Sequence, residues 1–91
     1  MAQIIVMQLG PEEFRVIVTD AGAKHEHTVT LPRHARDGLG LRGVPPAALV
    51  EESFRFLLER KEPDDIPATF VLPTIAGEFP EYPEEIRGRF G

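Results

Sequence analysis

The first third of the chain alternates between apolar and polar positions, a pattern that predicts β-strands. Residues 3–9 form a short apolar run rich in β-branched side chains, and a Gly-Pro pair ends it. Residues 13–19 and 24–31 alternate, so that every second side chain lies on the same face. The DAGA stretch between these two segments is typical of a turn, and Pro32 ends the second segment. The sequence therefore predicts three strands, at about 3–9, 13–19 and 24–31.

The second and third predicted strands can be aligned with each other. With residues 20–23 as the loop, Thr19 opposes Lys24 and Val18 opposes His25. This register places the apolar side chains of both strands on one face, with two histidines at its hairpin end. The expected face consists of Phe14, Val16, Val18, Val29 and Leu31, beside His25 and His27. A shift by one residue would turn a strand over and lose this agreement, so the register is well specified.

The clearest helical pattern lies between Pro46 and Lys61. Apolar side chains recur there at spacings of three and four, acidic residues come early and basic residues late. Pro63 ends the pattern, so we expect a helix over about 46–61. Its apolar stripe consists of Leu49, Val50, Ser53, Phe54, Leu57 and Leu58. The glycine-rich stretch 33–44 before it is expected to form a loop or a single helical turn.

The segment after the helix, residues 64–90, combines several prolines with many large apolar side chains, which is too apolar for a linker. Pro73 and Pro83 each predict the first turn of a short helix. The predicted fold class is therefore α+β in a single domain, 1–91. A three-stranded antiparallel sheet is packed by one main helix, about 46–61, with a short-helical, proline-rich C-terminal segment.

The composition narrows the classes of function. The formal net charge of −5 argues against proteins that neutralise many phosphates, so nucleic acid is not an expected partner. The absence of cysteine excludes disulfides, thiol nucleophiles and cysteine-based metal sites, and it fits a cytoplasmic location. No apolar run is long enough to span a membrane, and the first residues lack the features of a signal peptide.

No set of residues for catalysis can be assembled from the sequence. Ser53 is the single serine and lies in the middle of the predicted helix, on its apolar side. The stretch GLGLRG at 38–43 matches G-x-G-x-x-G, but it follows a loop where a dinucleotide site needs a strand. We therefore expect no enzymatic activity and no cofactor.

All three histidines lie between residues 24 and 34. His25 and His27 share a strand face and could begin a zinc or copper site, with His34 as a third ligand. Glu26 points to the opposite face, and structural metal sites normally use four protein ligands. We therefore interpret the histidines as cover for the hairpin end of the sheet and expect no metal. A histidine-based metal-binding protein remains a further alternative.

Residues 28–61 resemble a ribbon–helix–helix DNA-binding module, through TVTLP at 28–32 and a later helix with ALVEESFRFLLERK. The resemblance implies a strand that pairs with that of a dimer mate, with Thr28, Thr30 and Arg33 facing the DNA. It implies a DNA-binding regulator or an antitoxin. This sequence departs from the module, because the first helix would contain two glycines and the preceding strands have no place in it.

Two other segments, SFRFLLER at 53–60 and FPEYPEEI at 79–86, resemble parts of small uncharacterised bacterial proteins. Those proteins combine a β-hairpin, an SFxFLLER-like helix and an FPEY-like tail. This second resemblance covers most of the chain but implies no known activity.

The remaining apolar residues of the strands suggest an interaction surface. If the helix covers the face that contains Val16, then Ile5, Met7 and Ile17 form an exposed patch on the other face. Monomers rarely leave a large apolar patch bare, so we expect an unknown protein partner or a second copy in a homodimer. The expected function is a small cytoplasmic protein-interaction or accessory domain without catalytic chemistry of its own.

Overall fold

The structure is a computed structural model that describes residues 2–91. Within these residues the chain forms four strands: β1 (Gln3–Gln8), β2 (Glu13–Asp20), β3 (Ala23–Thr30) and β4 (Thr69–Val71). The same residues form the helices α1 (Ala35–Gly38), α2 (Pro46–Leu58), α3 (Ile75–Glu78) and α4 (Tyr82–Phe90). Two short 3-10 helices, η1 (Pro63–Asp65) and η2 (Leu72–Thr74), flank β4.

The strands form one mixed sheet in the order β1-β2-β3-β4. The α+β class is confirmed, but the prediction of a three-stranded antiparallel sheet was wrong in its size and type. A fourth strand, β4, lies parallel to β3 and pairs Thr28 with Thr69. It is only three residues long and lies between Pro67 and Pro73, so it is too short for its periodicity to show in the sequence. Its parallel direction follows because α2 returns the chain across the sheet.

The predicted register of the hairpin is confirmed. Val18 opposes His25, and Val16 opposes His27, as the alternation of apolar residues required. The loop is shorter than predicted, because Asp20 and Ala23 belong to the strands and pair with each other. Ala21 and Gly22 alone make the turn, with φ of 51° and 82°. Positive φ at both positions is typical of the two-residue turn that suits the twist of a hairpin.

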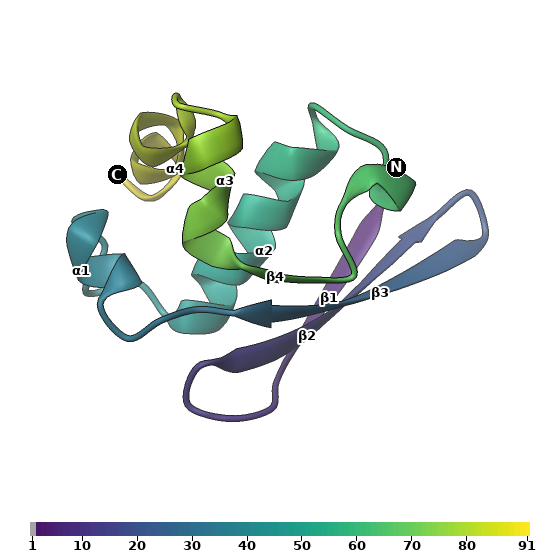
Figure 1. Cartoon of the computed structure of the whole chain (residues 1–91), viewed down its shortest axis with the longest axis horizontal. Coiled ribbons are helices and arrows are strands. Elements are labelled where there is room, and N and C mark those ends of the chain that lie inside the picture. Colours follow the sequence, from purple (N-terminus) through teal and green to yellow (C-terminus); the bar gives the residue numbers. More distant parts are fainter. Residues whose placement is uncertain (1) are drawn as a thin grey trace.

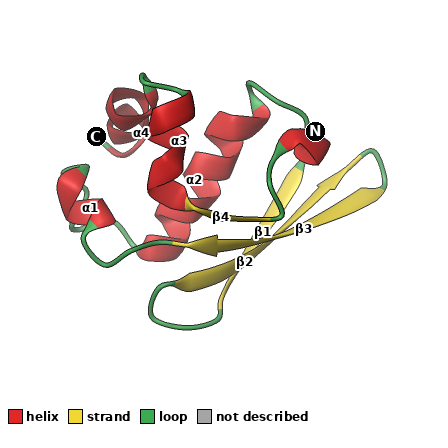
Figure 2. Ribbon diagram, viewed as in Figure 1, coloured by secondary structure: helices red, strands yellow, loops and turns green. Residues whose placement is uncertain are grey.

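The helices lie together on one side of the sheet, and none of the described residues 2–91 forms an element that covers its other face, which we call the bare face (Figures 1 and 2). The inner face of the sheet is completely buried at Phe14, Val16, Val18 and Val29. Residues of α2 complete this core from the other side, with Leu49, Val50, Phe54 and Leu57. A sheet that is apolar on one face only, with one long amphipathic helix to cover it, produces this two-layer arrangement.

The predicted helix reached residue 61, but α2 ends at Leu58. The chain continues as a tight turn, in which the backbone N–H groups of Arg60 and Lys61 both donate to the carbonyl of Leu57. Phe56 was not part of the predicted stripe, yet it is fully buried. The reason is a second contact on the back of α2, where the rings of Phe79 and Tyr82 lie 5.8 and 5.2 Å from that of Phe56.

The C-terminal segment forms short helices at the positions that its prolines predicted. Pro73 lies in the first turn of η2, which continues into α3, and Pro83 lies in the first turn of α4. A hydrogen bond of 2.7 Å between the hydroxyls of Ser53 and Tyr82 joins α4 to α2. Both side chains are almost completely buried, so this bond fixes the position of α4 within an apolar contact.

The bond between Ser53 and Tyr82 predicts non-additive effects on stability. Ser53→Ala and Tyr82→Phe each leave one buried hydroxyl without its partner, so each is expected to cost about 1 to 2 kcal/mol of unfolding free energy. The double variant removes both hydroxyls and should cost clearly less than the sum. Urea denaturation of the four proteins measures this difference, and additive effects would contradict the contact.

Tyr82 also predicts an alkaline limit of stability. Burial raises the pKa of its phenol above the ordinary value, against the opposing effect of the hydrogen bond from Ser53. The neutral phenol therefore stabilises the fold below about pH 10, and this contribution is lost as the pH rises through the folded-state pKa. The chain has one tyrosine and no tryptophan, so the absorbance of the phenolate reports this residue alone. The pH midpoint of phenol ionisation should be higher in the native protein than in the protein unfolded in urea. Equal midpoints in the two states would contradict the burial of Tyr82.

Candidate functional site

The bare face of the sheet carries an apolar patch along β1. Ile5 is 52%, Met7 38% and Leu9 51% exposed. Ile5 lies directly opposite Ile17 of β2, which is half-buried. The structure thus brings together the three predicted residues Ile5, Met7 and Ile17, and it adds Leu9. We call these four residues the β1 patch. The alternation of β1 could have indicated Leu9, because it follows Ile5 and Met7 in steps of two.

Between the β1 patch and Val71 at the opposite edge, the bare face is mainly polar. On β2 and β3 it presents Arg15 and Glu26, whose charged groups lie 4.0 Å apart and whose side chains are 46% and 66% exposed. Thr28 and Thr30 continue this polar surface toward β4. The β1 patch is therefore confined to one edge of the sheet and is bordered by polar groups, the usual composition of an interface core and its rim.

β1 also presents unpaired backbone groups, because it is an edge strand of the sheet. The N–H of Leu9 donates to the carbonyl of Glu13 in β2, at 2.8 Å. Backbone groups alternate in direction along an antiparallel strand, so those of Ile4, Val6 and Gln8 point away from β2. These outward N–H and C=O groups can pair with a further strand.

The edge at β1 lacks the features that usually prevent pairing with other chains. Residues 2–11 contain no ionisable side chain, and β1 itself has no proline and no break in its register. The opposite edge is protected, because β4 is only three residues long and lies between Pro67 and Pro73. Of the two edges, β1 is therefore the one that is open to a partner.

His25 and His27 both lie on the helix-facing side of β3 and contact the segment before β4. The ring of His27 is almost completely buried, 5.4 Å from that of Phe54. Its Nδ1 donates to the carbonyl of Pro67 at 2.9 Å, because a carbonyl can only accept. The Nδ1 of His25 lies 3.2 Å from a carboxylate oxygen of Asp64. The two side chains thus hold η1 and the start of β4 against the sheet.

The structure does not gather the three histidines into one site. His34 lies beyond Pro32 and is the N-cap residue that directly precedes α1. Within residues 2–91, no three side chains of the His, Cys, Asp and Glu types are placed to hold a metal ion together. In this part of the chain Nε2 of His27 has no hydrogen-bond partner, and the ring as a whole packs beside that of Phe54.

The residues that the ribbon–helix–helix resemblance assigns to DNA lie in a different setting. Thr28 and Thr30 do point to the bare face, but β3 is an interior strand that pairs with β2 and β4. The N–H of Thr28 donates to the carbonyl of Ala68 at 2.7 Å, so this strand has no free edge for a dimer mate. The backbone N–H of Arg33 is bound to the carboxylate of Glu12, 2.6 Å away.

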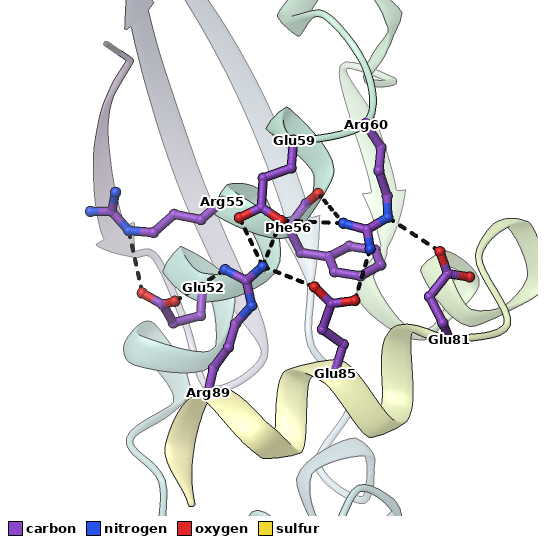
Figure 3. Close-up of polar contacts among 8 residues, drawn as sticks. All are labelled: Glu52, Arg55, Phe56, Glu59, Arg60, Glu81, Glu85 and Arg89. Carbon is purple, nitrogen blue, oxygen red and sulfur yellow. Dashed lines mark hydrogen bonds and ion pairs between the residues drawn. The ribbon is translucent and has the colours of Figure 1, made fainter.

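The densest group of charges joins α2 and α4 on the outside of the helical layer (Figure 3). The guanidinium of Arg60 lies over the ring of Phe56, 3.7 Å from its centre. It donates to Glu81 at 3.3 Å and to Glu85 at 2.8 Å. Arg60 therefore closes the core above Phe56 while its charge is paired, which is a structural role.

Arg89 forms the second centre of this ionic network. One of its nitrogens lies 2.8 and 2.9 Å from the two carboxylate oxygens of Glu59. The same nitrogen lies 3.3 Å from a carboxylate oxygen of Glu85, and the other terminal nitrogen of Arg89 lies 3.6 Å from one of Glu52. The hydrogen bond from Arg89 lowers the pKa of Glu59, and the hydrogen bond to Glu59 raises the pKa of Arg89. Both charges are used within the fold, so the network is not a free anion site.

An apolar hollow of about 240 Å³ lies between α1 and the α3 region. It is lined by Ala35, Gly38, Leu39, Leu72, Pro73, Ala76 and Tyr82. The hydroxyl of Tyr82 is bound to Ser53. The hollow therefore lacks the convergent polar groups that orient a small ligand, and it is smaller than most ligand pockets.

Comparison of the chain with protein-family models, with curated proteins and with solved structures gave no match. Among the described residues, no helix has the length and apolar character needed to cross a membrane. The geometry of the bare face and of β1 is therefore the basis for assigning a function.

The ionic network predicts a pH-dependent effect of Arg89→Met. At neutral pH the loss of the guanidinium leaves Glu52, Glu59 and Glu85 close together, and we expect a cost of about 1 kcal/mol. The lowered pKa of Glu59 means that its contribution is present above about pH 4.5 and is lost as the pH falls through its folded-state value. The wild type and the Arg89→Met variant should therefore differ less in unfolding free energy, measured by urea denaturation, as the pH is lowered. A difference that is constant with pH would contradict this pairing.

Proposed function

We propose that this protein is a small protein-interaction domain and that the β1 patch is its contact surface. The observation that supports the proposal is the one-sided sheet. The described helices cover one face, while Ile5, Met7 and Leu9 stay exposed on the other, next to an edge with unpaired backbone groups. Such apolar surface on a small monomer is typical of a binding site.

Contact with a partner would stabilise a complex through apolar burial. In the β1 patch, Ile5 and Leu9 are about half exposed to water, and Met7 is 38% exposed. Burying that remaining surface contributes about 1 kcal/mol for each side chain. Arg15 and Glu26 would lie at the border of the contact, where polar groups stay hydrated and favour one orientation of the partner.

Other classes of function have less support from the geometry. Ser53 is the single serine, and its hydroxyl is fully buried against Tyr82, where a substrate would not reach it. A DNA-binding ribbon needs a strand with a free edge, and Thr28 and Thr30 lie on an interior strand. The net charge of −5 also favours a protein partner over nucleic acid. The proposed role is therefore that of an accessory domain without catalytic chemistry of its own.

The proposal predicts that Ile17→Lys weakens partner binding. A photo-cross-linking amino acid at Ile17, in the native cells, should attach one protein specifically, and that protein should then bind the purified chain. Ile17→Lys places a charge at the centre of the β1 patch and should weaken this binding at least about 10-fold, which is 1.4 kcal/mol or more.

Val71→Lys is the matched control for this experiment. Val71 is 40% exposed, and its pairing with Thr30 places it on the same bare face at the opposite edge. The control adds the same charge and should bind the partner like the wild type. Equal binding by Ile17→Lys, or equal loss in Val71→Lys, would contradict the β1 patch as the contact surface.

A further inference from the structure

We infer that β1 pairs with β1 of a second copy of the chain, antiparallel, across a two-fold axis that passes at Val6. The two four-stranded sheets would then form one continuous sheet. The inference rests on the proposed function, since it uses the same open edge, and it names one occupant of that edge.

The hydrogen-bonding groups of β1 fit this register. The outward backbone groups belong to Ile4, Val6 and Gln8. With the axis at Val6, the two Val6 residues exchange hydrogen bonds with each other, and Ile4 exchanges them with Gln8 of the second copy. Every backbone group that β1 directs away from β2 thus gains a partner.

The side chains favour the same register. Opposed residues of an antiparallel pair point to the same face, so a closed two-fold axis is perpendicular to the sheet and both helical layers lie on one side. The axis at Val6 places Ile5 opposite Met7 of the second copy, and Leu9 opposite Gln3. An axis at Ile5 would leave Leu9 without a described counterpart. The register at Val6 therefore combines full pairing of the outward backbone groups with apolar contact between Ile5 and Met7.

The distribution of charge favours a second copy as the occupant. Two molecules that each carry a net charge of −5 repel each other wherever their acidic side chains meet. Residues 2–11 contain no ionisable side chain, so the two paired strands themselves oppose no like charges. An uncharged strand offers no electrostatic attraction to a basic partner. Two identical uncharged strands can pair without charge repulsion between them.

The edge is also accessible from the helical side. A groove of about 440 Å³ runs beside Ala2 and Ile4 and is bordered by Leu58 and Arg55 of α2. α2 packs on β1 at this side, where Ile4 and Val6 are half-buried, and the groove lies beside the helix at the Ala2 end of the strand. Its rim carries both signs of charge, among them Arg89 and Glu59, so two such rims can face each other.

The predicted dimer is weak. Pairing over residues 3–9 extends roughly 25 Å along a single strand. One strand pair of this length buries less surface than the roughly 800 Å² per partner of a standard interface. We expect a dissociation constant on the order of tens of micromolar. The mass of the purified protein in sedimentation equilibrium should therefore rise from that of a monomer toward twice this value between about 1 µM and 1 mM.

A pair of matched double variants tests the contact. Ile5→Lys/Met7→Lys places like charges directly opposite each other in the proposed dimer, so this variant should stay monomeric. Thr69→Lys/Val71→Lys adds the same charge to the exposed edge strand β4 and should associate like the wild type. Both variants reduce the net negative charge, so general repulsion cannot explain a loss of association. Equal loss in the two variants would overturn the inference.

The register can be tested by cross-linking, because the chain has no cysteine. Ile5 and Met7 of the second copy would be opposed with their Cα atoms about 4.5 Å apart, within the range of a disulfide. A mixture of Ile5→Cys and Met7→Cys proteins, oxidised with glutathione disulfide, should form the mixed dimer. Each variant alone should form far less. Equal cross-linking of Ile5→Cys alone would overturn the register at Val6.

The two proposals can fail separately. Self-association is measured on the purified chain, whereas the function is tested with the partner attached at Ile17. A wild type that stays monomeric at about 1 mM overturns self-pairing. If that monomer still binds its partner through the β1 patch, the interaction function holds and the edge serves the other protein instead.

Discussion

The packing of α2 against one face of the sheet is the contact on which the rest of the structure depends. Phe14, Val16 and Val18 are completely buried beneath that helix, and Phe54 of α2 is equally buried above them. A domain of this size can bury only about 60 to 65% of its unfolded surface. The helices of residues 35–90 all lie on the same side of the sheet (Figure 2). The other face stays open as a consequence of how this small core is built.

The back of α2 explains the C-terminal third of the chain. Phe56 is apolar and points away from the sheet, so a second layer is needed to cover it, and Phe79 and Tyr82 provide that layer. Arg60 closes the same cluster from outside (Figure 3). On the other side of the core, His27 binds the carbonyl of Pro67 and holds the chain where β4 begins. These contacts are internal, which leaves β1 as the part of the sheet that is available to other molecules.

The sequence predicted the parts of the fold that depend on local periodicity. The alternation at Phe14, Val16 and Val18 determined the register of the hairpin, because any odd shift would expose these residues. The sequence pattern did not predict β4, because the position of this strand depends on the return of the chain across the sheet. It also placed Ile5, Met7 and Ile17 on one face, but not the ionic network, because Arg60 and Glu85 meet only after α4 has docked on α2. Local patterns carry no information about such distant contacts.

The central claim is that the β1 edge of the sheet is open in the monomer and becomes paired in the functional state. Amide hydrogen exchange followed by NMR at each residue of β1 tests this most directly. In dilute protein the amides of Ile5 and Met7 should be protected by β2, whereas those of Ile4, Val6 and Gln8 should exchange rapidly. At high concentration, or with the partner bound, the second group should become protected as well. Slow exchange of all these amides in the dilute monomer, or no change on association, would contradict the claim.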